Sequence, residues 1–169
     1  MLRIVCDTRE QRPLRFSNEV EVIHQALTVG DYSIQGLEDQ VIIERKSLSD
    51  LLASITSGRE RFTRELRQLR AFRFAALVVE SDWPTIMTGM WPCPSAVHPN
   101  AALGSLMSFT VKYGVQVVMA DDHQTAAALV ERLLSLYAKM VERDAAALSS
   151  VRTPAAVPQT ESKTLEVAG

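Results

Sequence analysis

Residues 41–46, VIIERK, are the stretch of this sequence from which its fold can be argued. Three apolar residues open the stretch and predict a buried strand, which three charged residues close. Because side chains alternate along a strand, we expect Glu44 and Lys46 on one face and Arg45 on the other. A carboxylate and an ammonium group are thereby placed together at the end of a buried strand.

Two helices are expected directly after this strand. Ser47 is a candidate N-cap, and Asp50, three residues later, completes a capping box. Apolar residues then recur with the helical period, and Gly58 is a natural C-terminal stop. The second helix is expected over residues 59–72, with one apolar face and arginines on its other sides.

The remaining elements alternate between short apolar runs and helical patterns. Before the central stretch, a meander of strands is expected, over residues 3–7, 20–27 and 32–34, and a tight turn at 36–40 predicts a hairpin with the central strand. After it, the pattern predicts strands at 74–80 and 115–119, helices at 100–113 and 122–144, and an irregular proline-rich segment at 82–99. This order is typical of an α/β sheet flanked by helices.

Composition restricts the class of protein. The chain has 169 residues, 47% hydrophobic and 22% charged, which is enough for one domain with its own core. It contains neither an apolar run long enough to span a membrane nor a signal-peptide pattern, and its two cysteines cannot build a disulfide framework. A cytoplasmic protein without a membrane partner is therefore expected.

The distribution of charge bears on nucleic-acid binding. The net charge of −2 excludes a bulk polycation that holds DNA by charge alone. Residues 1–75 hold 12 Lys/Arg and 11 Asp/Glu, a net of +1, whereas residues 76–169 hold 6 and 9, a net of −3. Any anion-binding face is therefore expected as a local patch in the first half.

The hairpin also brings a second carboxylate toward the central strand. Asp31 begins the strand before the turn, so pairing of the two strands places it near Glu44, with Lys46 beside both. Two close carboxylates repel each other unless a cation joins them, and their oxygens suit Mg²⁺ or Mn²⁺. Such a site can hold a phosphate and activate a water for phosphodiester hydrolysis. Taken alone, this spacing also occurs by chance on solvated strands.

At this point the sequence resembles a known family. The segments GDY at 30–32 and IIERKSLSDL at 42–51 match the G-D…E-R-K-x3-D pattern of XPF-type nucleases. CDTRE at 6–10 is similar to the first acidic motif of the family, and Ser57-Gly58-Arg59 to its Gly-Arg helix start. The resemblance covers about residues 1–143. It implies a restriction-endonuclease-like fold of the PD-(D/E)XK superfamily, a central mixed sheet flanked by helices.

The resemblance also implies a role for each matching residue. Asp31 and Glu44 would bind Mg²⁺ or Mn²⁺, with the main-chain carbonyl of Arg45 as a third oxygen ligand. Lys46 would assist the attacking water. Asp7 would be a further acid at the site, acting through water. The Arg45 side chain would support the site or contact phosphate.

Three other positions have two interpretations each. Glu10 either belongs to the site or pairs with an arginine such as Arg9 or Arg12. Asp50 either belongs to the site or serves as the capping residue described above. Arg59 either binds DNA, as the family motif implies, or lies on a solvated helix face.

The implied function is a metal-dependent DNA endonuclease that cuts near junctions of single and double strands, in DNA repair or recombination. Residues 1–144 would form the nuclease domain and residues 145–169 a disordered tail, too short for the helix-hairpin-helix module that usually follows in the family. A stand-alone bacterial or phage nuclease is expected, with a possible protein partner supplying selectivity. The alternatives are a catalytically silent DNA-binding scaffold and a nuclease acting on another nucleic acid.

The helix expected over 122–144 predicts a homodimer. Its apolar residues span roughly 160° at about 100° per residue, wider than the arc needed to pack once on a sheet. The surplus is either Leu129, Leu136 and Met140 on one flank or Leu134 and Val141 on the other. A surplus of this kind usually marks an interface, which the family resemblance also implies. The alternative is deeper burial against the helix at 100–113.

Overall fold

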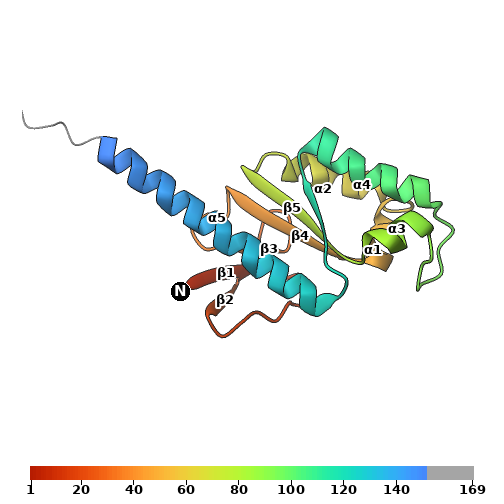
Figure 1. The fold of residues 1–169 in the computed structure, drawn as a ribbon, viewed down its shortest axis with the longest axis horizontal. Helices are drawn as coiled ribbons and strands as arrows, with labels where there is room; N and C mark the ends of the chain where they lie inside the picture. The colour runs from red at the N-terminus through yellow and green to blue at the C-terminus, as the bar shows by residue number, and fades with distance from the viewer. Residues whose placement is uncertain (152–169) are drawn as a thin grey trace, which may run out of the picture.

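The computed structural model describes residues 1–151, in which a six-stranded mixed sheet separates two layers of helices (Figure 1). The strands are β1 (Leu2–Cys6), β2 (Val20–His24), β3 (Tyr32–Ile34), β4 (Val41–Ser47), β5 (Phe74–Glu80) and β6 (Gln116–Met119). The helices are α1 (Leu48–Ser54), α2 (Arg59–Leu69), α3 (Trp83–Thr88), α4 (Pro99–Tyr113) and α5 (His123–Val151). The predicted fold class, a central mixed sheet flanked by helices, is confirmed.

The strand order is β2-β1-β3-β4-β5-β6, and its first half differs from the predicted meander. The β3–β4 pair is antiparallel, which confirms the hairpin, and β4, β5 and β6 run parallel. However, β2 lies outside β1 and parallel to it, so the segment between them crosses over instead of making a tight turn. The second strand also ends at His24, before the predicted end.

Strand alternation gives the sheet two apolar faces, each covered by its own helices. Ile42 packs into the cluster formed with α1, α2 and α4, whereas Val41 and Ile43 pack into the cluster formed with α5. A strand in the middle of the sheet is buried on both faces, which explains its continuous apolar run. Figure 1 shows α5 crossing one face alone, while the other helices gather on the opposite face.

Two segments differ from their predicted form. The segment predicted as irregular contains α3, because Asp82 accepts a hydrogen bond from the Thr85 N–H at 2.6 Å and Pro84 fits the first turn. The last helix continues past Asp144 to Val151, through an alanine-rich run with high helix propensity. The domain boundary at residue 144 stays a prediction, and residues 152–169 of the predicted tail lie outside the described residues.

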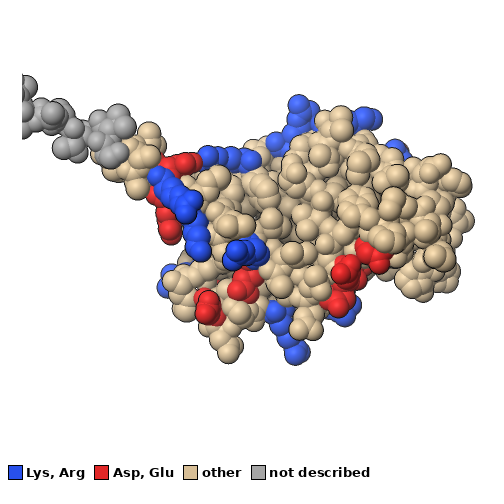
Figure 2. Space-filling model, viewed as in Figure 1, with Lys and Arg blue, Asp and Glu red and all other residues tan. Residues whose placement is uncertain are grey.

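Charged side chains are unevenly distributed on the surface. In the view of Figure 2, both positively and negatively charged side chains lie along α5, whereas the surface over α3 and α4 carries few charged side chains. Within residues 1–151, no helix combines the length and apolar character required to cross a bilayer.

The turn before β3 depends on a glycine. Gly30 has φ +76°, a left-handed conformation that residues with a Cβ rarely adopt. A Cβ at this position would overlap Cγ1 of Ile42, a stiff and buried side chain, and would lie 3.3 Å from the carbonyl oxygen of Ile43. This close approach allows the next residue, Asp31, to reach β4.

We expect Gly30→Ala to lower the free energy of unfolding by more than the left-handed backbone conformation alone would cost. Gly36 is the matched control, because it has φ +82° and, apart from its chain neighbours, no atom of residues 1–151 lies within 4 Å of the place that a Cβ would take there. Gly36→Ala should cost about 1 kcal/mol of unfolding free energy for the left-handed conformation, and Gly30→Ala about twice that or more. Urea denaturation measures both. Equal losses would contradict the proposed steric contact with Ile42.

Candidate active site

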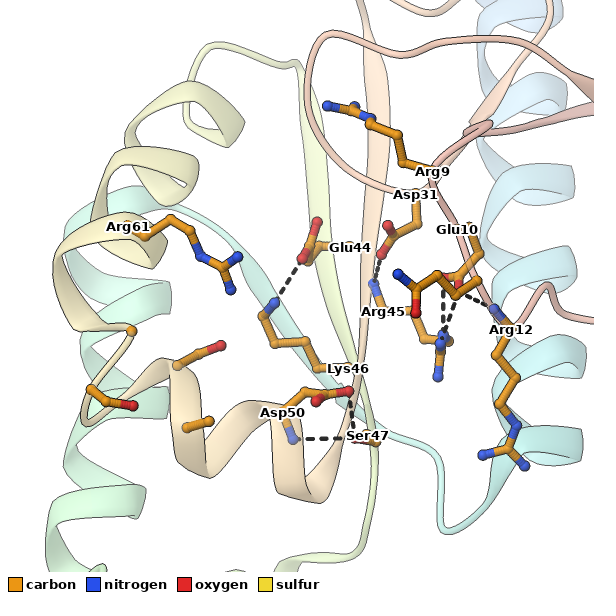
Figure 3. Close-up of a pocket in the computed structure, with 15 residues that line it drawn as sticks. Arg9, Glu10, Arg12, Asp31, Glu44, Arg45, Lys46, Ser47, Asp50 and Arg61 are labelled. Atoms are coloured by element: carbon orange, nitrogen blue, oxygen red, sulfur yellow. Dashed lines mark hydrogen bonds and ion pairs between the residues drawn. The ribbon is translucent and has the colours of Figure 1, made fainter.

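The charged end of β4 points its side chains to two faces, as alternation predicts. Glu44 and Lys46 face α1 and α2, and the Lys46 ammonium donates to Glu44 Oε1 at 2.9 Å (Figure 3). The ammonium nitrogen also lies 4.4 Å from the centroid of the Phe62 ring, a cation–π contact. Both charged side chains are almost completely buried. Lys46 is therefore held at a fixed place above the core.

Asp31 reaches the same place from the neighbouring strand. Its N–H donates to the carbonyl oxygen of Ile43 at 2.9 Å, and its Oδ2 accepts from the Arg45 N–H at 2.7 Å. Asp31, Glu44 and Lys46 line one cavity of about 490 Å³. The predicted meeting of two carboxylates and one ammonium is thus present in the fold.

The two carboxylates are electrostatically strained. Burial and the nearby Glu44 raise the pKa of Asp31 to about 8. Burial also raises the pKa of Glu44, although Lys46 acts against it. A divalent cation between the two would favour the charged form of both groups, and carboxylate oxygens fit Mg²⁺ or Mn²⁺.

The donor set for a metal is small. Among residues 1–151, no three His, Cys, Asp or Glu side chains converge as a metal-binding group. The fit therefore depends on Asp31 and Glu44, and the main-chain oxygen of Arg45 as a third ligand stays a prediction. As a ligand set, this matches Mg²⁺, which keeps several waters and uses few carboxylates.

Asp7 lies near this pair but its oxygens are already occupied. Oδ1 accepts from the Arg9 main-chain N–H at 2.8 Å and from Arg9 Nε at 2.7 Å, and Oδ2 accepts from the Leu27 N–H at 2.6 Å. Burial acts to raise the pKa of Asp7, but these hydrogen bonds outweigh it and hold the pKa below its usual value. Asp7 shares a second cavity, of about 430 Å³, with Asp31 and Glu44. Its predicted action through water stays a prediction.

The Arg45 side chain is held on the other face of β4, between two carboxylates. Its Nη2 lies 3.1 Å from Glu10 Oε1, and its Nη1 lies 2.8 Å from Glu80 Oε1. Glu80 also lies 2.6 Å from His123 Nδ1, at the start of α5. The side chains of Glu10, Arg45 and Glu80 are almost completely buried, whereas His123 is partly exposed. Together these four residues anchor β4 to β5, to the segment after β1 and to α5.

Of the residues with two interpretations, two have structural partners. Glu10 pairs with Arg45, while also lining the first cavity. The Asp50 N–H donates to Ser47 Oγ at 3.1 Å, which confirms the helix cap, and Asp50 lines the same cavity. Arg59 is exposed at the first position of α2 and does not line either cavity, so its binding of DNA stays a prediction.

Sequence reasoning missed four residues around the site, namely Arg9, Arg61, Glu80 and His123. The signal for Glu80 was present, because it ends an apolar strand that pairs with the central one, and its register partner is Ser47. The signal for Arg9 was its place inside the first acidic motif. His123 carried no sequence signal, since it lies far along the chain from the motifs and meets Glu80 only in the fold.

Comparison with known proteins agrees with this geometry. Residues 6–133 match the family model of the ERCC4 domain. The chain belongs to this family. The predicted XPF-type nuclease domain is thereby confirmed. The chain is 31% identical over 140 residues to the 3′-flap repair endonuclease Xpf of Saccharolobus solfataricus, a match that covers 79% of this chain and 54% of that protein.

Other similar proteins differ in length and context. A putative ATP-dependent RNA helicase of Methanocaldococcus jannaschii is 26% identical over 133 residues, covering 78% of this chain and 15% of that protein. XPF from Aeropyrum pernix in complex with DNA has a TM-score of 0.66 at 25% identity, covering 82% of this chain and 66% of that one. A second Aeropyrum pernix XPF structure has a TM-score of 0.62 at 23% identity, covering 90% and 75%. The chain thus spans about half the length of Xpf and a smaller part of the helicase.

The raised pKa values predict how the stability of the metal-free protein varies with pH. The pKa of Asp31 is about 8 in the folded state and 3.8 in its ordinary state, so between these values the folded protein binds more protons than the unfolded chain. The free energy of unfolding therefore falls as pH rises through this window. The pKa values of Asp7 and Glu80 are lowered, so the stability that these two groups contribute is lost only as the pH falls to acid values.

Thermal melts in EDTA from about pH 5.5 to 8.5 measure this dependence. We expect the melting temperature of the wild type to fall across the range. Asp31→Asn should melt higher than the wild type at the alkaline end and lose much of the dependence. A wild type that becomes more stable over this range would contradict the strained pair.

Proposed function

We propose that this chain is a divalent-metal-dependent DNA endonuclease that hydrolyses phosphodiester bonds near junctions of single and double strands, in DNA repair or recombination. The observation that carries the proposal is the pairing of half-buried Asp31 with buried Glu44, with Lys46 fixed beside them, in an ERCC4 domain. One relative is named a 3′-flap repair endonuclease, and one similar structure is a complex with DNA. Both names support DNA as the substrate.

Each residue has a distinct part in this reaction. Asp31, Glu44 and the Arg45 carbonyl would hold Mg²⁺ or Mn²⁺, which supplies a positive charge for the phosphate and lowers the pKa of water. Lys46 has its ammonium aimed into the cavity by Glu44 and supported by the Phe62 ring. From there it would orient the attacking water and stabilise negative charge. Arg45 keeps β4 in place through its two buried carboxylate partners.

A catalytically silent DNA-binding scaffold is the alternative from another class. A scaffold would have no need of half-buried Asp31 beside buried Glu44, because their charges cost stability unless a cation binds. A nuclease for another nucleic acid would keep the same site, so the substrate panel has to include RNA.

We expect cleavage of DNA in Mg²⁺ or Mn²⁺ and none in EDTA. The panel is 5′-labelled fork, flap, duplex and single-stranded DNA, with single-stranded RNA as a further arm. Asp31→Ala and Glu44→Ala should abolish cutting, and Lys46→Ala should slow it by roughly 10²-fold or more, because it removes a group that acts on the water. Thermal melts check that the variants remain folded. Full activity of Asp31→Ala would contradict the site, and cleavage of RNA alone would favour the other nuclease.

The homodimer is a separate proposal, which the described part of α5 supports. Leu134 is completely buried against the sheet, so that flank is not surplus. Leu136 and Met140, on the other flank, are 52% and 37% exposed, and Leu129 is partly buried. An exposed apolar stripe on a helix that projects beyond the sheet suits a second copy of the chain, with a different protein partner as the alternative.

We expect light scattering at micromolar concentration to give about twice the chain mass of 18.7 kDa. Leu136→Glu should produce a monomer without unfolding it, because it places a charge in the apolar stripe. Glu142→Lys is the control, since it reverses a charge at an exposed position of the same helix that is turned well away from Leu136, and it should leave the dimer intact. A strictly monomeric wild type would contradict the dimer.

A further inference from the structure

Four arginines line the two cavities beside the carboxylate pair, and two of them are already committed. Arg9 donates to Asp7, and Arg45 is held between Glu10 and Glu80. Arg12 lines only the first cavity, whereas Arg61 lines both. Within residues 1–151, Arg61 forms one ion pair, to Glu65, with a long Nε–Oε1 distance of 3.8 Å, and the Arg61 side chain is 69% exposed. Arg61 is therefore a cation held only loosely at the edge of the site.

The position of Arg61 is central although its contacts are few. It lines both the cavity of about 490 Å³ and the cavity of about 430 Å³, which meet at Asp31, Glu44 and Lys46. Figure 3 shows its guanidinium directed from α2 toward Lys46 and Glu44. Arg61 thus stands opposite the carboxylates across the opening in which a phosphate would lie.

The fold holds this part of α2 in place. Phe62 is buried beneath the Lys46 ammonium and packs edge-on against Phe109, with 5.4 Å between ring centroids. Successive residues of a helix are turned by about 100°, so the inward direction of Phe62 places Arg61 at the rim. The start of the helix is tied to α1 by the hydrogen bond from the Gly58 N–H to the Ala53 carbonyl, 2.9 Å.

Folding gains little from an arginine at this position. Arg61 lies in the first turn of α2, where the positive end of the helix dipole disfavours a cation. An Arg followed by Glu four residues later is also the weaker order for a helical ion pair. The same features suit an anionic ligand, because a cation that is poorly neutralised by the protein is available to bind one.

We propose that Arg61 binds the phosphate of the nucleic acid that is cut and stabilises the negative charge that builds on its oxygens. The proposal rests on the proposed function, and it deepens it by naming a substrate-contacting residue opposite Lys46. The planar guanidinium matches two phosphate oxygens at once, which an ammonium cannot do. On binding, Arg61 would exchange the exposed contact with Glu65 for a charge-assisted hydrogen bond to phosphate.

Cleavage kinetics in Mg²⁺ test the proposal. Arg61→Ala should lower kcat by roughly 10²-fold, as for other groups that stabilise transition-state charge, and Arg61→Lys should keep an intermediate rate. Arg64→Ala is the matched control, because Arg64 is exposed on the same helix and lies outside both cavities. It should change KM alone. A kcat of Arg61→Ala equal to that of the wild type would overturn the proposal.

Binding measurements test the role of Arg61 even if the wild type cuts no substrate. A wild type that cuts no substrate would overturn the proposed function but not phosphate binding by Arg61. In Ca²⁺, the affinity for labelled flap DNA is measured against salt concentration. Loss of one phosphate contact should flatten the slope of log K against log salt by about 0.9 for Arg61→Ala. Arg64→Ala should flatten it less. Equal slopes for the two variants would overturn the role of Arg61.

A double-mutant cycle tests the exchange of partners. Glu65→Gln should tighten DNA binding, because it releases Arg61 from its competitor. This gain should disappear when Arg61 is already alanine, since the two effects would then act through one contact. A gain that persists in the double variant would show that Glu65 acts only as a general negative charge, and would overturn the exchange.

Discussion

The pairing of β3 with β4 is the interaction on which the site depends. One hydrogen bond, from the Arg45 N–H to Asp31 Oδ2, joins the carboxylate of one strand to the backbone of the next. Gly30 makes this approach possible because it has no Cβ to meet Ile42. Strand alternation then separates the functions of β4, with Glu44 and Lys46 turned to the cavity and Arg45 turned to its anchors.

The two faces of β4 carry different arrangements of charged groups, balanced on one face and with an excess of carboxylates on the other. On one face, Arg45 lies between Glu10 and Glu80, so each buried charge has a partner. On the other face, two carboxylates lie beside a single ammonium, and burial together with the Glu44 charge raises the pKa of Asp31. The first arrangement holds the strands together, whereas the second keeps a place where a cation and a phosphate are favoured. Stability and chemistry are thus divided between the faces of one strand.

Much of the site was predictable because it is local in the chain. The hairpin joins Asp31 to Glu44, the period of two places Lys46 beside Glu44, and the helix cap at Ser47 follows at once. Sequence reasoning was wrong where pairing is distant or where prolines suggested irregularity. The parallel placement of β2 beside β1 and the short helix α3 within 82–99 are the two examples.

The sequence by itself determined the motif, the hairpin and the apolar faces, because these depend on spacing within a few residues and on the alternation of a strand. Only the tertiary structure decided which charges meet across elements. It brought Glu80 and His123 behind Arg45, occupied the oxygens of Asp7 with Arg9, and placed Arg61 across the cavity. The physical reason is that long side chains from separate elements meet only where packing of those elements directs them. Burial of Phe62 under Lys46, which turns Arg61 to the rim, is such a case.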